Sequence, residues 1–180
     1  MPIEEADMLR AWALAEVTGP GMQIPQLDPV REKLRVGGTA SLNDWDWWLL
    51  EKTVPIARAP ILGALLPLRV SWYRGHLTIE ALAEQARTFN FAPFDKVAPS
   101  RQLAALCRAI RRPDAPEFDR AAMTVPPVFV APSITGPWCL IEGYRRCCRA
   151  LRDRDGGRFD GQPLPVIVGV HPSTETWALW

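Results

Sequence analysis

Pro137-Trp-Cys-Leu-Ile-Glu-Gly-Tyr-Arg-Arg-Cys-Cys-Arg-Ala150 is the stretch in which the hydrophobic period of the chain changes, at a single glycine. Residues 138–141 form a short apolar run after a turn, which predicts a strand. Gly143 ends this run, and a helical pattern with two contrasting faces follows. Its apolar face consists of Tyr144, Cys147, Cys148 and Leu151, and its basic face consists of Arg145, Arg149 and Arg152. The stretch therefore predicts a strand, a tight glycine turn and the start of a helix.

The predicted helix start has the features of an anion-binding site. Free backbone N–H groups and the positive end of the helix dipole point outward there. Arg145 and Arg146 lie in the first turn, where cations are unfavourable unless an anion is close. One possible anion is Glu142, in which case the arginines are solvated or paired with nearby acids such as Asp153. The other is a bound phosphate, because backbone amides and guanidinium groups both suit phosphate oxygens.

Two further strands are predicted around this unit. Val128–Ala131 and the strand at 138–142 are separated by a turn sequence and should form an antiparallel hairpin. Because two prolines precede Val128–Ala131, we expect that strand near the edge of the sheet. Leu164–Val170 is continuously apolar and β-branched, which is typical of a buried strand. With the strand at 138–142 and a helix at 144–153, it predicts a βαβ unit with a right-handed crossover.

Helices are also predicted at several places earlier in the chain. They span residues 4–17, 42–52, 78–89 and 100–112. An Asn or Asp at the start of the second can cap it, and Thr78 and Ser100 can cap the third and fourth. Residues 19–41 are rich in Gly and Pro, which predicts a mainly irregular segment, although Pro29–Leu34 could make a helical turn.

The C-terminal half of the chain resembles the core of the ParB/sulfiredoxin superfamily. In that core, a Pro-hydrophobic-x-Val strand pairs with a strand ending in Gly-x-x-Arg, and a helix and an x-Pro-Val-Ile-Val strand follow. The matching segments here are Pro127-Val-Phe-Val130, Gly143-Tyr-Arg-Arg146 and Leu164-Pro-Val-Ile-Val-Gly-Val170. The resemblance implies an α+β fold, with a small mixed sheet flanked by helices at residues 61–180. Residues 1–60 would form a helical, tryptophan-rich N-terminal lobe.

The resemblance also implies a nucleotide site at the Gly-x-x-Arg motif. ParB proteins use this motif to hold the triphosphate of CTP. This chain keeps the glycine and both arginines of the motif. It has Tyr144 where ParB proteins have a Glu, and Cys148 where they often have a third Arg. Sulfiredoxins carry their reactive cysteine directly after the glycine, so Tyr144 argues against sulfiredoxin activity. The free serine kinases of the superfamily carry an acid directly before the glycine, and Glu142 matches that acid.

Site residues follow from this comparison. Glu142 would be catalytic, as a base or as a metal ligand. The nucleotide-binding residues would be Gly143, Tyr144, Arg145, Arg146, Arg149 and His171. The ligand would be ATP or CTP, or the diphosphate, with Mg²⁺, and no separate metal site is expected. His171 would reach the site if the C-terminal end of its strand lies near the motif.

Net charge, apolar stretches and cysteine spacing argue against several classes of protein. The net charge of +1 gives no support to non-specific nucleic-acid binding, and without a helix-turn-helix domain we do not expect sequence-specific DNA binding. The N-terminal stretch is acidic and lacks the apolar core of a signal peptide, and the longest apolar stretch, 59–68, is interrupted by prolines. We therefore expect a cytoplasmic protein without a membrane partner. Its four cysteines lack C-x-x-C spacing and are expected to be reduced core residues.

Two functions stay open at this stage. The first is an enzyme, a nucleotide-dependent phosphotransferase or nucleotide hydrolase in which Arg146 holds phosphate and Glu142 acts as base or metal ligand. The second is a non-catalytic nucleotide-sensing or partner-binding module, such as an accessory factor of a bacterial plasmid, phage or toxin system. The cluster Trp45, Trp47 and Trp48 could anchor a protein partner, although we expect these tryptophans to pack the N-terminal lobe onto the core.

Overall fold

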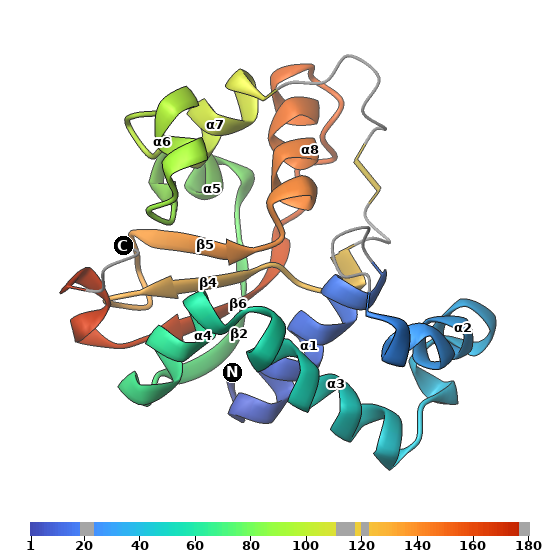
Figure 1. The fold of residues 1–180 in the computed structure, drawn as a ribbon. Coiled ribbons are helices and arrows are strands. Elements are labelled where there is room, and N and C mark those ends of the chain that lie inside the picture. The colour runs from blue at the N-terminus through green and yellow to red at the C-terminus, as the bar shows by residue number, and fades with distance from the viewer. Residues whose placement is uncertain (19–23, 111–117, 120–122, 177–180) are drawn as a thin grey trace.

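The computed structural model describes residues 1–18, 24–110, 118–119 and 123–176, and within them the chain forms one mixed sheet between two layers of helices (Figure 1). The strands are β1 (Pro2–Ile3), β2 (Ser71–Leu77), β3 (Ala86–Thr88), β4 (Val128–Ala131), β5 (Trp138–Glu142) and β6 (Leu164–Val170). They lie side by side in the order β1-β2-β6-β4-β5-β3. Only the pairs β4/β6 and β3/β5 are parallel among these strands. The predicted α+β class with a small mixed sheet is confirmed.

Helices cover both faces of this sheet. One layer is formed by α1 (Glu5–Thr18), α3 (Asp44–Ala57) and α4 (Ala59–Leu65), with α2 (Asp28–Gly37) beside α1. The other layer is formed by α5 (Ile79–Gln85), α7 (Leu103–Ala109) and α8 (Tyr144–Asp155), with α6 (Ala92–Val97) beside α7. The helices of the N-terminal part therefore pack directly on the sheet, and β1 is one of its strands.

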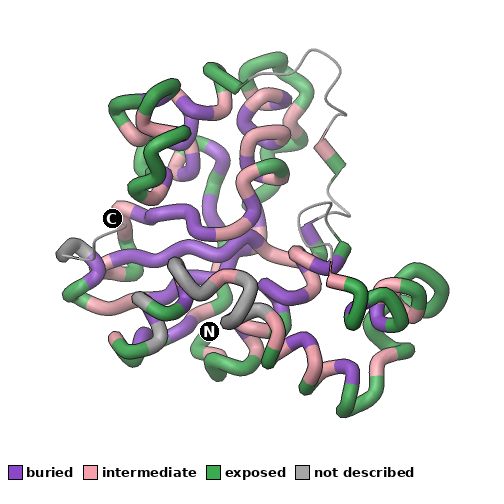
Figure 2. The backbone as a smooth tube through the Cα atoms, in the orientation of Figure 1, coloured by how far each residue is buried: buried purple, intermediate pink, exposed green. Residues whose placement is uncertain are grey.

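The two cores are separated by the alternation of side chains along the central strands. In β4, Val128 and Val130 join the core beneath α1 and α3, whereas Phe129 and Ala131 join the core beneath α5, α7 and α8. All four side chains are fully buried. Figure 2 shows the same pattern as continuous buried backbone through the middle of the sheet. Burial of apolar surface stabilises the folded state by about 25 cal/mol per Å². Because β4 contributes buried side chains to both cores, it stabilises both layers of helices.

The predicted β4–β5 hairpin is confirmed, but the predicted edge position of β4 is wrong. Val130 pairs with Cys139 of β5 on one side and with Gly169 of β6 on the other. The prolines do not prevent this because they precede the strand. Pro127 contributes only its carbonyl oxygen, which accepts a hydrogen bond from the Ile167 N–H at 2.9 Å.

The predicted βαβ unit made by β5, α8 and β6 is also wrong. The strand β5 runs antiparallel to β4, and β4 runs parallel to β6, so β5 and β6 are antiparallel and are not neighbours. The parallel pair is β4 and β6, and its connection contains both β5 and α8. The prediction treated the hairpin and the crossover separately, whereas the chain turns from β4 into β5 and then crosses over through α8 to return beside β4.

Helix starts were predicted better than helix lengths. Thr78 caps α5 by accepting the Ala81 N–H at 3.1 Å, and Asn43 caps α3 by accepting the Asp46 N–H at 3.0 Å. However, α5 ends at Gln85 and the chain continues as β3, so the helix predicted to reach residue 89 is too long. Helix α7 begins after Gln102 rather than at Ser100. The segment predicted to be mainly irregular contains α2, which includes and extends the helical turn expected at Pro29–Leu34.

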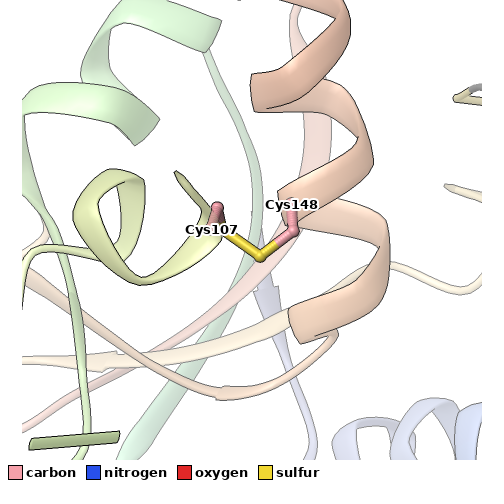
Figure 3. The surroundings of a disulfide bond; sticks show 2 residues. All are labelled: Cys107 and Cys148. Atoms are coloured by element: carbon pink, nitrogen blue, oxygen red, sulfur yellow. A yellow bond between two sulfur atoms is a disulfide. The ribbon is translucent and has the colours of Figure 1, made fainter. Parts of the chain in front are cut away.

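The prediction of reduced cysteines is wrong for one pair. A disulfide joins Cys107 of α7 to Cys148 of α8, across 41 residues of sequence (Figure 3). Cys139 and Cys147 are free and buried, as predicted for small core residues. The spacing of the cysteines could not indicate the pair, because it depends on two separate helices becoming neighbours.

Candidate functional site

Gly143 makes the turn between β5 and α8 in a way that other residues would resist. Its φ is +102°, in the left-handed region that favours glycine. A β-carbon at this position would lie 2.5 Å from Cβ of Pro127 and 3.2 Å from a terminal nitrogen of Arg146. The absence of a side chain thus allows both the sharp turn and the close approach of Arg146. The predicted strand, glycine turn and helix start are confirmed.

Arg146 lies back across this turn and pairs with Glu142, the last residue of β5. A terminal guanidinium nitrogen of Arg146 donates to a carboxylate oxygen of Glu142, and only 15% and 13% of the two side chains are exposed. The Nε of Arg146 is buried and has no hydrogen-bond partner among the described residues. The pair therefore leaves one buried donor of the guanidinium unsatisfied, which costs free energy.

The Glu142 carboxyl is electrostatically unusual. Burial raises its pKa to about 7, Arg146 and the Gly143 N–H oppose this rise, and the charge of Glu16 adds to it. A carboxyl group with a pKa near neutrality, beside a specific charged partner, is a recognised mark of functional sites. It can change its protonation state in the physiological range.

A second ion pair faces the first one from the N-terminal helices. Arg58, between α3 and α4, donates through Nε and a terminal nitrogen to both carboxylate oxygens of Glu16 in α1. Trp12 Nε1 donates to the same carboxylate at 3.1 Å. Glu16 raises the pKa of Arg58, and Glu142 adds a smaller contribution in the same direction. We call Glu16, Arg58, Glu142 and Arg146 the charged cluster; its two ion pairs, one from the N-terminal helices and one from the β5–α8 turn, interact through their charges.

The other predicted residues of the motif have different surroundings. The hydroxyl of Tyr144 donates to the Leu140 carbonyl at 2.7 Å and accepts the Phe89 N–H at 3.3 Å, and its ring packs on Phe94. Its polar group is therefore used within the fold. Arg145 is exposed and Arg149 is partly buried, and both lie on α8.

The structure does not bring His171 to this turn. His171 follows β6 directly, at the end where Val170 pairs with Ala131 of β4. Glu142 pairs with Val128, at the opposite end of β4. The antiparallel course of β5 thus separates His171 from the motif. The imidazole Nδ1 instead accepts the Ser173 N–H at 3.1 Å.

Sequence reasoning missed Glu16 and Arg58. A signal for each was available: Glu16 interrupts the apolar end of α1 four residues after Trp12, and Arg58 is a single charge within the apolar stretch 54–66. An isolated charge in an apolar segment needs a partner when it is buried. The identity of the partners depended on the packing of α1 on α3 and could not be deduced.

A stacked pair of tryptophans is exposed on α3. The rings of Trp45 and Trp48 have centroids 4.6 Å apart, and the residues are 62% and 45% exposed. Of the three tryptophans expected to pack onto the core, only Trp47 does so. The guanidinium of Arg10 lies over its ring in a cation–π contact. The other two present a large aromatic surface to solvent.

The comparisons with known proteins give no relative. No protein-family model, no curated protein and no solved structure matches the chain. In the ranges that the structure describes, no group of three or more His, Cys, Asp or Glu side chains is arranged to hold a metal ion. None of the helices in the described part of the chain has the length and apolar character that a bilayer span requires.

Proposed function

We propose that the protein binds a nucleotide, ATP or CTP, with its phosphates at the start of α8. The observation that carries this proposal is the position of Arg146, which lies across Gly143 at the helix start with a buried Nε that has no partner among the described residues. Phosphate offers several oxygens to such a guanidinium, and the first-turn amides add further donors. The resemblance of this motif to the ParB/sulfiredoxin superfamily supports the same assignment, and a cytoplasmic location would provide the nucleotide.

Binding would require Arg146 to exchange its partner. Glu142 now occupies one side of the guanidinium, but burial and the charge of Glu16 raise its pKa to about 7, so its ionised form is disfavoured. A phosphate group carries more charge than a carboxylate and would replace it on Arg146. Protonation of Glu142 would favour the exchange, since a neutral acid competes less strongly for the arginine.

A catalytic role for Glu142 is the second part of the proposal. Once displaced from Arg146, its carboxylate would lie beside the phosphates, where it could accept a proton from an acceptor hydroxyl or from water. Magnesium usually binds through one or two carboxylates and the substrate phosphates. Glu142 would be the candidate protein ligand, and the nucleotide would supply most of the remaining oxygens. Turnover of ATP or CTP would make the protein a phosphotransferase or a hydrolase.

The proposal is tested by measuring nucleotide affinity for a set of variants by calorimetry, with and without Mg²⁺. Arg146→Lys keeps the positive charge but cannot donate two parallel hydrogen bonds to phosphate as a guanidinium does. The double variant Arg146→Ala with Glu142→Gln removes the guanidinium without leaving a buried carboxylate unpaired. Both should abolish binding. Arg154→Ala, at the other end of the same helix, is the matched control and should bind normally.

Glu142→Gln distinguishes the possible roles. It should strengthen nucleotide binding because it removes the anion that competes for Arg146, and it should abolish any turnover if Glu142 is the base. An unchanged affinity in this variant, with normal binding in Arg146→Lys, would reject the site.

The exposed tryptophans favour a second candidate function. Trp45 and Trp48 form a solvent-facing aromatic surface on α3, and tryptophan is enriched at binding hot spots. In this alternative the protein is a non-catalytic module that binds a protein partner through α3. Nucleotide-dependent association without turnover would support it, and loss of that association on Trp45→Ala with Trp48→Ala would locate the surface.

A further inference from the structure

A cavity of about 110 Å³ lies between α7 and α8, apart from the charged cluster. Its lining includes Cys107, Arg108, Cys148, Arg152, Asp155 and Arg158. Both cysteines of the disulfide belong to this lining, so the cross-link of Figure 3 lies at the wall of a cavity rather than inside the core. A small molecule that enters the cavity therefore lies against both cysteines.

The two disulfide cysteines differ from the two free ones in accessibility. Cys107 and Cys148 are both partly exposed. Cys139 and Cys147 are buried, and burial raises the pKa of each thiol to about 12. Thiolate, and not thiol, is the reactive form. Only the disulfide pair is therefore placed for exchange with a reagent from solvent.

The charged side chains in the lining of the cavity are mainly cationic. Arg108, Arg152 and Arg158 contribute guanidinium groups, against the carboxylate of Asp155. Two of these arginines also hold Asp153, at 3.3 Å from Arg152 and 2.7 Å from Arg158. Positive charge beside a cysteine lowers the pKa of its thiol, and a thiol of low pKa leaves faster when a disulfide is attacked.

The contact between α7 and α8 does not depend on the disulfide alone. Leu103 and Leu106 of α7 and Leu151 of α8 are buried in the same core, with Ala150 beside them. These apolar contacts would persist after the sulfur–sulfur bond is broken. Opening of the cross-link is therefore compatible with a folded protein.

We propose that the Cys107–Cys148 disulfide is a redox-active cross-link that exchanges with a small thiol bearing carboxylates, of the glutathione class, at this cavity. The attacking thiolate bonds to one cysteine sulfur, the Cys107–Cys148 bond breaks, and the other cysteine leaves as a thiolate beside the arginines. A second molecule of the small thiol attacks the mixed disulfide. The products are two cysteine thiols and one oxidised small-thiol disulfide, so two electrons pass to the protein.

The carboxylates of such a thiol match the arginines at the cavity wall, whereas a cationic thiol does not. In a reducing compartment, protein disulfides are mostly transient, catalytic or redox-sensing. A disulfide that a glutathione-class thiol can open and close would report the redox state of its surroundings.

The test compares reduction of the native protein by glutathione and by cysteamine, a cationic thiol, at equal thiolate concentration. Newly formed thiols are alkylated and mapped by mass spectrometry. We expect label at Cys107 and Cys148 but not at Cys139 or Cys147, and several-fold faster reduction by glutathione. Arg108→Gln should reduce this preference. Arg35→Gln, which removes the same charge from exposed α2, should leave it unchanged.

Two results of this comparison would overturn the proposal. One is that Cys107 and Cys148 are labelled only after a denaturant unfolds the chain. The other is that the ratio of the glutathione and cysteamine rates is the same in Arg108→Gln and Arg35→Gln. The variant Cys107→Ser with Cys148→Ser adds an independent measurement, because it should fold and melt cooperatively. Failure of this variant to fold would make the disulfide a structural requirement and would also contradict the proposal.

Discussion

Gly143 and Pro127 are in such close contact that a β-carbon on the glycine would lie 2.5 Å from Cβ and 2.9 Å from Cα of the proline. Gly143 also has a φ of +102°. Gly143→Ala should therefore lower the free energy of unfolding by about 3 kcal/mol, since a strained backbone conformation and a steric clash act together. Urea unfolding followed by circular dichroism measures this loss.

Gly157 provides the matched control for this substitution. Its φ is +70°, but a β-carbon there would meet no atom within 4 Å. Gly157→Ala carries the backbone strain without the clash and should cost about 1 kcal/mol. Equal losses in the two alanine variants would show that Pro127 does not confine the turn.

The stability of the protein should depend on pH through Glu142. Burial raises the folded-state pKa of this carboxyl group from an ordinary 4.5 to about 7, with Glu16 adding to the rise and Arg146 opposing it. The folded state then binds more protons than the unfolded state between these values, so the free energy of unfolding falls as pH rises through this window. The full effect is about 3 kcal/mol.

Glu142→Gln should remove this part of the pH dependence. The variant should match the parent at low pH and exceed it in stability above pH 7. The measurement is the free energy of unfolding from urea titrations at a series of pH values across the window. A parent protein whose stability rises with pH there, or an unchanged slope in the variant, would contradict the buried state of this carboxyl group.

Asn43 and Asp46 make a reciprocal cap at the start of α3. Asn43 Oδ1 accepts the Asp46 N–H at 3.0 Å, and Asp46 Oδ2 accepts the Asn43 N–H at 2.9 Å. Asn43→Ala should cost about 1 kcal/mol, the usual value of a helix N-cap. Asp46→Ala should cost more, because Asp46 is also the ion-pair partner of Lys33. Thermal unfolding of the two variants compares the losses, and the reverse order would contradict the arrangement.

The tryptophans should separate into structural and exposed groups. Trp12→Ala removes a side chain that is 1% exposed and should cost about 3–5 kcal/mol. Trp45→Ala and Trp48→Ala should each change stability by less than about 1 kcal/mol, because they lose little more than the stacking contact. Large losses at these exposed positions would mean that the pair supports the fold rather than a partner.

Local signals in the sequence were sufficient for much of the fold. The β4–β5 hairpin, the buried strand β6 and the cap at Thr78 depend on a few adjacent residues and were predicted correctly, and Asn43 proved to be the cap where an Asn or an Asp was expected. The glycine turn at Gly143 was also predicted, because the change of hydrophobic period occurs at that residue. These features need no knowledge of distant segments.

Features that depend on distant segments were not predictable. The position of β4 between β5 and β6 separated His171 from the motif, although each strand had been identified. Glu16 and Arg58 are 42 residues apart and meet only because α1 packs on α3. The same holds for Cys107 and Cys148. In each case the packing of two helices or the order of strands decides which side chains meet.

The position of β6 has a consequence for how the protein is made. It is the final strand of the described chain, yet it lies in the interior of the sheet between β2 and β4. Among the described strands, β6 alone pairs with both β2 and β4, so until residues 164–170 emerge from the ribosome the group of β1 and β2 is not joined to that of β3, β4 and β5. Both groups carry unpaired strand edges during that time, and such edges favour aggregation. Completion of the sheet thus waits for β6, and until that strand is made both groups expose unpaired edges to other chains.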